Sequence, residues 1–364
     1  SINSLTMYGH QNEFSCKAGT AGKHFSPSDT FDITGYYAPV CGLDALSLTG
    51  NEYGKWFWSR NKRIKEAVKL AEKIYAQGSF ISFSAHMPNF ELISQMQNGT
   101  LGPEDEKYKD IQKILDDGSI NFHGYTPNDL RGTVVKDIVA GGKLNSIYRQ
   151  YLDLIAGFFI ELQEKNLPLI FRPFHENSGG WFWWGTNSCS AEEFKKLWQY
   201  TYEYFVNEKD IHNLIWAYSP GSEAKTREEF LERYPGDSYV DLIGIDMYER
   251  LPEQKDTFFE EFDFHLKLHS EIAAEHNKLF ACTETGVAHE NGKALLETGN
   301  EDMEWYQKIA DCCIKNNACY FLLWANFSRH GGYYAPYVEK KGIFRKTVFR
   351  HEMTESFIRM FNDR

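Results

Sequence analysis

Residues 167–185 read LPLIFRPFHENSGGWFWWG, a short apolar run followed at once by charged residues, glycines and tryptophans. The apolar part, residues 167–171, has the length of a buried β-strand and is too short for a typical helix. The polar and aromatic residues behind it would make a poor core loop, but they suit a site at the end of a strand. The stretch therefore predicts a strand that carries functional residues at its carboxyl end.

The same pattern recurs along the chain. Seven further apolar runs end in polar residues, at 5–9, 36–43, 80–85, 213–218, 240–245, 278–283 and 320–325. Amphipathic segments of helical spacing lie between several of them, for example Ile64–Tyr75, which Gly78 ends as a C-cap, and Ile147–Leu162. Ser190 with Glu193 reads as a capping box that opens another helix.

Strands that alternate with helices indicate a parallel sheet, and eight of them indicate that the sheet closes. We therefore expect a (β/α)8 TIM barrel, class α/β, forming a single domain over residues 1–364. An open doubly wound sheet is the alternative.

Polar residues follow the predicted strands, and in a barrel they would all face the mouth where active sites of this fold lie. The long connection over residues 87–145 is expected to contain short helices and to help wall the cleft. In chain order the polar residues are His10 and Gln11, then Asp44, His86, Arg172, His175, Glu176, Ser219, Asp246, Tyr248, Glu284, Trp324 and Asn326.

Composition narrows the possible partners. The net charge of −12 would repel a phosphate backbone, so we expect no nucleic acid partner. No stretch approaches the roughly 20 apolar residues of a membrane span, so we expect no membrane partner either. Aromatic residues make up 16% of the chain, and such rings grip the apolar faces of sugars.

The cellular location of the protein decides whether its cysteines can form disulfides. No signal peptide is visible, so the sequence is either a mature secreted or periplasmic form, which we expect, or a cytoplasmic protein. We expect a monomer. The seven cysteines include Cys16 and Cys41, which could form a disulfide if the protein is exported.

Glu176 and Glu284 are the candidate catalytic pair. They come after the fourth and seventh predicted strands, which places both at the mouth of a barrel. Glycoside hydrolysis uses two such carboxyl groups, about 5–5.5 Å apart when one attacks the sugar and the other protonates the departing oxygen. An inverting enzyme would hold them further apart.

The chain resembles glycoside hydrolase family 26, and its endo-β-1,4-mannanase branch in particular. The resemblance covers almost the whole sequence. It rests on Gly9–Gln11, Tyr36–Val40 with Asp44, Ser84–Pro88, Arg172–Gly185, Gly244–Tyr248, Thr283–Gly286 and Trp324.

The resemblance implies a role for each site residue. Glu176 resembles the general acid/base and Glu284 the nucleophile of a retaining enzyme that cuts β-mannan, galactomannan, glucomannan or manno-oligosaccharides. Arg172 and Tyr248 would donate hydrogen bonds to Glu284, and His175 would orient Glu176 or bind the sugar. We expect Glu176, as the acid, to be less solvated or closer to negative charge than Glu284. The expected sugar-binding residues are Trp181 and Trp324, as stacking platforms, with His86 and Asp246, as hydroxyl ligands.

Other activities stay open within the family: release of mannobiose from chain ends, or cleavage of mixed-linkage β-glucan or β-1,3-xylan. A polysaccharide-binding protein without catalysis is the alternative outside the enzymes, but both glutamates are present. We expect no metal and no cofactor. Gly179 and Gly180 stand where HExxH would need its second histidine, Leu144 interrupts a phosphate-binding loop, and Gly221-Ser222 does not supply GxSxG.

Overall fold

Eight parallel strands close into a barrel in which neighbours along the chain are neighbours in the sheet. The barrel confirms the predicted fold class and excludes the open sheet. The strands are β1 (Met7–Gln11), β2 (Val40–Asp44), β3 (Phe80–Ala85), β4 (Leu169–Pro173), β5 (Leu214–Tyr218), β6 (Leu242–Glu249), β7 (Leu279–Val287) and β8 (Tyr320–Leu323). The structure, a computed structural model, describes residues 5–19, 26–52, 58–250, 257–288, 295–328, 332–341 and 347–362.

Several strands end later than the sequence pattern predicted. The ladder between β6 and β7 continues through the pairs Asp246 with Glu284 and Tyr248 with Gly286, beyond a register shift after Ile245. These polar residues therefore lie within the strands and not after them. The apolar run stops earlier than the strand because backbone hydrogen bonds, which side-chain hydropathy does not report, hold the ladder together. Four further polar residues also lie within strands and not after them: His10, Gln11, Asp44 and Arg172.

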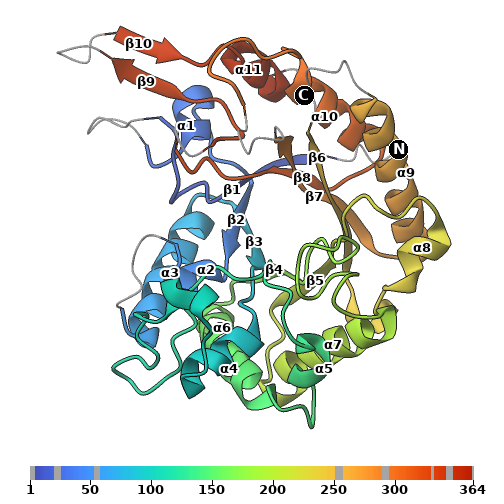
Figure 1. Ribbon diagram of the computed structural model, residues 1–364. Coiled ribbons are helices and arrows are strands. Elements are labelled where there is room, and N and C mark those ends of the chain that lie inside the picture. Colours follow the sequence, from blue (N-terminus) through green and yellow to red (C-terminus); the bar gives the residue numbers. More distant parts are fainter. Residues whose placement is uncertain are drawn as a thin grey trace. The chain divides into compact units, whose positions relative to one another are not determined.

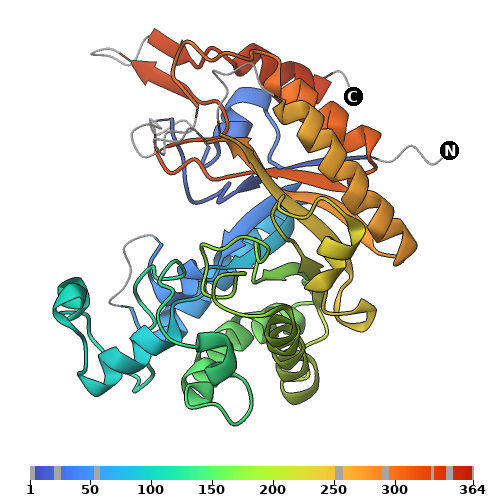
Figure 2. The ribbon, with the colours of Figure 1, turned by 45° about the vertical axis from the view of Figure 1, so that its right-hand side comes forward.

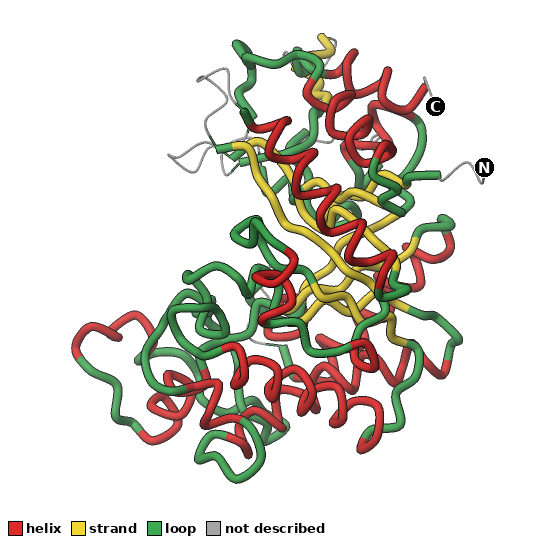
Figure 3. Tube along the Cα trace, turned by 90° about the vertical axis from the view of Figure 1, so that its right-hand side faces the viewer, coloured by secondary structure: helices red, strands yellow, loops and turns green. Residues whose placement is uncertain are grey.

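One compact unit comprises residues 1–42, 74–82 and 242–364. In it α9 packs along β6 and β7, and α10 contacts both α9 and α11 (Figures 1 and 3). The sequence did not predict α11 or the antiparallel hairpin of β9 (Val338–Lys341) and β10 (Thr347–Arg350). The helices of this unit are α1 (Asp29–Thr34), α9 (Phe258–Glu275), α10 (Trp305–Lys315) and α11 (Thr354–Asn362).

The other compact unit comprises residues 43–73 and 83–241. In it α5 packs on α6 and α7, and α4 packs on α6 (Figures 1 and 2). Its longer helices are α3 (Arg60–Ala76, which runs into the first unit), α4 (Phe90–Asn98), α6 (Asn145–Glu164) and α7 (Ala191–Glu203). The shorter ones are α2 (Leu46–Thr49), η1 (Pro103–Tyr108), α5 (Val134–Ile138), the π-helical turn η2 (Tyr204–Glu208), α8 (Arg227–Glu232) and η3 (Asp237–Tyr239).

The local helix signals were correct. Ser190 and Glu193 form both hydrogen bonds of a capping box at the start of α7. Gly78 lies two residues beyond α3 with φ 81°, the left-handed geometry that favours glycine. The long connection after β3 contains the expected short helices α4, η1 and α5. The prediction of one domain over residues 1–364 stays a prediction.

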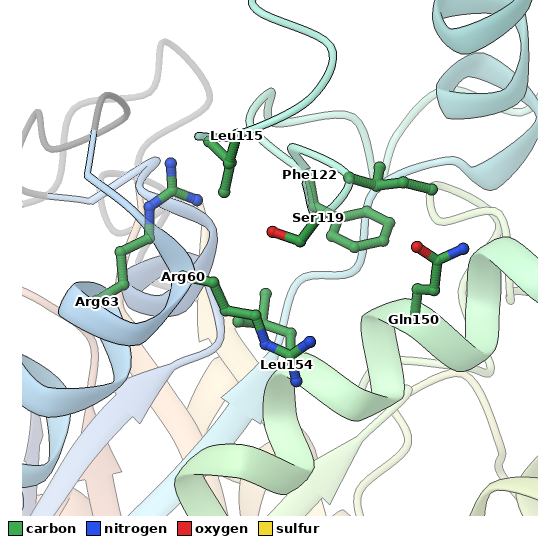
Figure 4. A pocket seen from close by; sticks show the side chains of 8 residues that line it. Arg60, Arg63, Leu115, Ser119, Phe122, Gln150 and Leu154 are labelled. Atoms are coloured by element: carbon green, nitrogen blue, oxygen red, sulfur yellow. The ribbon is translucent and has the colours of Figure 1, made fainter. Parts of the chain in front are cut away.

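A small cavity in the second unit has a structural role. Its volume is about 20 Å³, close to the space of one water molecule, and Figure 4 shows two arginines of α3 beside it. Arg63 donates a 2.7 Å hydrogen bond to the carbonyl of Thr49, the last residue of α2. No candidate site residue is part of its lining, which consists of Arg60, Arg63, Leu115, Ser119, Ile120, Phe122, Gln150 and Leu154.

The disulfide considered for Cys16 and Cys41 does not form. All seven cysteines are described, and none of them is in a disulfide bond. Cys41 lies buried in β2, where its Sγ donates to the carbonyl of Ala38 at 3.6 Å. It behaves as a small core residue.

Candidate active site

Glu176 lies on a strained turn directly after β4. Phe174 and Glu176 have φ of 51° and 52°, in the left-handed region that L-residues with side chains rarely adopt. Such strain persists only where surrounding contacts hold it, and it clusters at functional sites. The backbone N–H of Glu176 donates to the carbonyl of Ser219, just past β5, at 2.8 Å. The turn is thus tied to the neighbouring strand.

Two further residues of this turn bond to the segment at the end of β5. Asn177 is fully buried; its Nδ2 donates to the carbonyl of Phe174 at 3.2 Å, and its Oδ1 accepts from the hydroxyl of Tyr218 at 3.2 Å. The backbone N–H of Gly221 donates to Ser178 Oγ at 2.8 Å. These bonds hold the unusual backbone and so fix the direction of the Glu176 side chain.

Trp181 contacts the carboxyl group of Glu176. Its indole Nε1–H donates to Glu176 Oε2 at 2.7 Å, while 38% of the residue's surface stays exposed. A Cβ atom on Gly179 would lie 2.3 Å from the Trp181 ring, so only glycine lets the indole fold back over the turn. Trp181 was predicted as a sugar platform, and this hydrogen bond was not foreseen.

Glu284 lies within β7 and is 3% exposed. The hydroxyl of Tyr248 on β6 donates to Glu284 Oε2 at 2.7 Å, as the sequence analysis expected. Asp246, paired with Glu284 across the two strands, is 3% exposed and accepts a 2.6 Å hydrogen bond from Thr283 Oγ1. The fixed strand ladder thus places one donor directly on the Glu284 carboxylate.

Glu176 is not the less solvated of the two glutamates, and the alternative, that it lies closer to negative charge, stays a prediction. Glu284 is buried in a strand, whereas Glu176 is only half-buried because it lies on a turn beyond the strand end. The indole of Trp181 supplies a hydrogen bond that favours the ionised form of Glu176. Burial in the unliganded protein therefore does not mark Glu176 as the acid.

Arg172 and the two histidines belong to the same unit as Glu176. Arg172, 1% exposed, donates to Ser219 Oγ at 3.2 Å. His86 Nε2 lies 3.1 Å from His175 Nε2, and His86 Nδ1 lies 2.8 Å from Asp44 Oδ2. Burial, with His86 and Arg172 nearby, holds the pKa of His175 well below its ordinary value. His175 is therefore neutral at neutral pH.

Asp44 was noted at the end of the second strand but received no role. Burial alone would raise its pKa, yet the interaction with His86 and the hydrogen bonds from His86, Ser84 and the Leu46 backbone outweigh burial and lower it. Asp44 is therefore an ionised, buried carboxylate.

Trp324 directly follows β8. Its side chain is half-buried, and its backbone N–H donates to the carbonyl of Thr285 on β7 at 3.2 Å. This placement leaves its predicted role as a sugar platform a prediction.

The sequence profile of glycosyl hydrolase family 26 matches residues 2–332. This chain belongs to glycosyl hydrolase family 26. The hairpin of β9 and β10 and the helix α11 lie beyond the matched segment.

Mannan-degrading enzymes are among the relatives of this family 26 chain. A mannan endo-1,4-β-mannosidase of Bifidobacterium adolescentis is 30% identical over 326 residues, which make up 87% of this chain and 29% of that protein. One of Bacillus subtilis is 34% identical over 160 residues, 42% of this chain and 39% of that protein. The matches thus span well under half of the length of these relatives.

Solved family 26 structures share the fold. The catalytic domain of the endo-β-1,4-mannanase of Bacillus sp. JAMB-750 is 28% identical with a TM-score of 0.81, covering 98% of this chain and 86% of that one. A modular endo-β-1,4-mannanase of Cellulomonas fimi is 26% identical with a TM-score of 0.78, covering 98% of this chain and 70% of that one.

Proposed function

We propose that this chain carries the activity of a retaining endo-β-1,4-mannanase that cuts internal bonds of mannan, galactomannan or glucomannan. One observation carries the proposal: a family 26 barrel holds one glutamate on a strained turn after β4 and another within β7, under a tyrosine hydroxyl. In a closed parallel barrel the carboxyl ends of all strands open at one mouth. This supports the action of Glu176 and Glu284 on the same bond.

The proposed reaction has two steps. Glu284 attacks the anomeric carbon while Glu176 protonates the departing oxygen, and a covalent glycosyl-enzyme forms. Glu176 then takes a proton from water, which displaces Glu284 and restores the β configuration. The hydroxyl of Tyr248 donates to Glu284 and aligns it for attack. We propose that Arg172 also donates to Glu284.

Glu176 must be protonated before it can act as an acid. Trp181 Nε1 now donates to its Oε2, which favours the ionised form. A sugar stacked on the indole would exclude water from Glu176 and oppose ionisation. We therefore propose that substrate binding prepares the acid. We also propose Trp324 as a second platform, His175 as the residue that orients Glu176 or binds the sugar, and His86 and Asp246 as hydroxyl ligands.

A substrate panel tests this function. The chain is incubated with galactomannan, glucomannan, lichenan and β-1,3-xylan, and the products are sized over time. Early oligosaccharides of mixed length from the first two substrates support internal cleavage of mannan. Mannobiose alone would indicate attack at chain ends, products from lichenan or xylan would indicate the other family activities, and binding without products would indicate a silent binding protein.

We further propose that the protein acts outside the cytoplasm, secreted or periplasmic, because polymeric mannan cannot cross a membrane. We propose that it works as a monomer, without metal or cofactor and without nucleic acid or membrane partners. Within the described residues, no helix has both the length and the apolar character to cross a bilayer.

A further inference from the structure

Three buried side chains form a hydrogen-bonded chain that ends next to Glu176. Asp44 Oδ2 lies 2.8 Å from His86 Nδ1, and His86 Nε2 lies 3.1 Å from His175 Nε2. The two imidazole centroids are 4.4 Å apart, with the rings inclined by 71°. Exposure is 1% for Asp44, 7% for His86 and 1% for His175, so water has little access to these bonds.

The Asp44 end of the chain fixes one proton. An ionised carboxylate only accepts hydrogen bonds. Asp44 Oδ1 accepts from the backbone N–H of Leu46 at 2.9 Å and of His86 at 3.2 Å, and Oδ2 accepts from Ser84 Oγ at 2.6 Å. The bond to His86 therefore needs a proton on His86 Nδ1.

That proton determines the next bond. A charged His86 would donate from Nε2 as well, and His175 would then carry its proton on Nδ1, where no acceptor lies within the described residues. We therefore take His86 as neutral with Nδ1–H; its Nε2 is then an acceptor, so His175 must donate from its own Nε2. The other nitrogen of His175, Nδ1, is then a bare acceptor, and it has no hydrogen-bond partner among the described residues. If His86 donated to His175 instead, His175 would carry its proton on Nδ1. That N–H would be buried without an acceptor, which is rarer and less favourable than a buried acceptor without a donor.

We propose that Asp44 is a positioning residue that sets the tautomers of His86 and His175, and thereby the direction of the hydrogen bonds beside Glu176. His175 directly precedes Glu176 on the strained turn, and Trp184 Nε1 holds the carbonyl of His175 at 2.8 Å. A ring locked by one defined hydrogen bond keeps the backbone under Glu176 in place. The role of Asp44 in catalysis rests on the proposed function, but the assignment of the two tautomers does not.

The Asp44→Asn variant should reverse the direction of the hydrogen bonds that link residue 44, His86 and His175, with almost no change in side-chain shape. The Asn oxygen takes the place of Oδ1, which faces two backbone N–H groups, so the amide NH2 faces His86 Nδ1. His86 then accepts at Nδ1 and carries its proton on Nε2. His175 must then accept a hydrogen bond from His86 at Nε2 and carry its own proton on Nδ1. Ser84→Ala is the matched control, because it removes a donor from the same oxygen without reversing any bond.

The test is long-range ¹H–¹⁵N NMR of the full chain labelled with ¹⁵N-histidine at neutral pH, assigned by replacing each of the two histidines in turn. We expect Nδ1–H on His86 and Nε2–H on His175 in the unaltered protein and in Ser84→Ala, and Nε2–H on His86 in Asp44→Asn. On mannan, kcat of Asp44→Asn should fall about 10- to 100-fold, the size of effect known for the hydrogen-bond partners of metal-bound histidines, with little change in KM. Asp153→Asn, on the outer helix α6, is the activity control and should keep the unaltered rate.

Each outcome decides the proposal. Nε2–H on His86 or Nδ1–H on His175 in the unaltered protein overturns it, and this outcome does not depend on whether Asp44→Asn folds. An unchanged Nδ1–H on His86 in folded Asp44→Asn also overturns it. Reversed tautomers with an unchanged kcat refute the positioning role. If the unaltered protein cleaves no mannan, the proposed function fails, while the tautomers still decide whether Asp44 sets the chain.

Discussion

Replacing Tyr248 by Phe should slow catalysis without unfolding the protein. The change removes only the hydroxyl that donates to Glu284 Oε2 at 2.7 Å. A hydrogen bond to a charged group contributes about 1.5–3 kcal/mol. Glu284 is 3% exposed, so little water can replace the lost donor. At 1.36 kcal/mol per tenfold change, kcat/KM should fall roughly 10- to 150-fold.

The assay uses two substrates that differ in their leaving group, mannan and an activated aryl β-mannobioside. Support of the nucleophile is needed for both, so the fall should be similar on both. The control is Tyr148→Phe, which removes a buried hydroxyl 2.7 Å from Thr201 Oγ1 and should lower stability by about 1 kcal/mol with the rate unchanged. Melting temperatures are recorded for both variants.

Two results would refute the reasoning about Tyr248. A fall of less than about threefold would be too small for a hydrogen bond to a buried charge. A fall confined to mannan would mean that Tyr248 supports departure of the leaving group and not attack.

Four further predictions test the remaining residues. The rate of Glu176→Ala on mannan should fall roughly 10² to 10⁴-fold. On the aryl substrate this variant should release a burst of aryl alcohol, followed by slow turnover that azide accelerates, whereas Glu284→Ala should be inactive on both substrates. The reverse pattern would exchange the roles of the two glutamates. Proton NMR of early hydrolysis, with a chelator present, should show the β anomer first, and an initial α anomer would contradict retention. Trp181→Phe keeps a ring but loses the hydrogen bond that orients the Glu176 carboxyl group, so kcat should fall more than KM rises; unchanged kinetics would remove any role for that hydrogen bond. Trp324→Ala should lower turnover by more than its loss of stability, measured as the melting temperature, can explain. A large loss of stability with unaltered kinetics would make Trp324 a core residue.

Features that depend on neighbouring residues could be predicted from the sequence. The capping box of Ser190 and Glu193 needs only residues three apart, and it is present. All eight apolar runs overlap the strands of the barrel, because burial on both faces requires short continuous apolar segments. The hydrogen bond from Tyr248 to Glu284 followed from the resemblance, and it is present.

Features that depend on distant partners could not be predicted. The left-handed backbone of Phe174 and Glu176 is held by groups beyond β5, and no local composition indicates it, since neither residue is a glycine. The hydrogen bond from Trp181 to Glu176 needs the indole to fold back over Gly179, which depends on that turn. Helix α11 packs on the core because Phe357 contacts Tyr8 in β1, with ring centroids 5.5 Å apart. This contact joins distant parts of the chain and could not be predicted, although the helical spacing of Phe357, Met360 and Phe361 is visible in the sequence.

The left-handed geometry at position 176 also affects how an inactive form should be made. Any residue with a side chain at position 176 retains the steric strain, whereas glycine removes it. The glycine variant should therefore have a free energy of unfolding about 1 kcal/mol higher than the alanine variant. Glu176→Gly should therefore melt at a higher temperature than Glu176→Ala while lacking the same carboxyl group. The glycine form would be the better scaffold for capturing polysaccharide without digesting it. The carboxyl group that the proposed reaction needs at position 176 thus comes with a backbone geometry that destabilises the turn, so thermal stability and turnover would compete at a single backbone position.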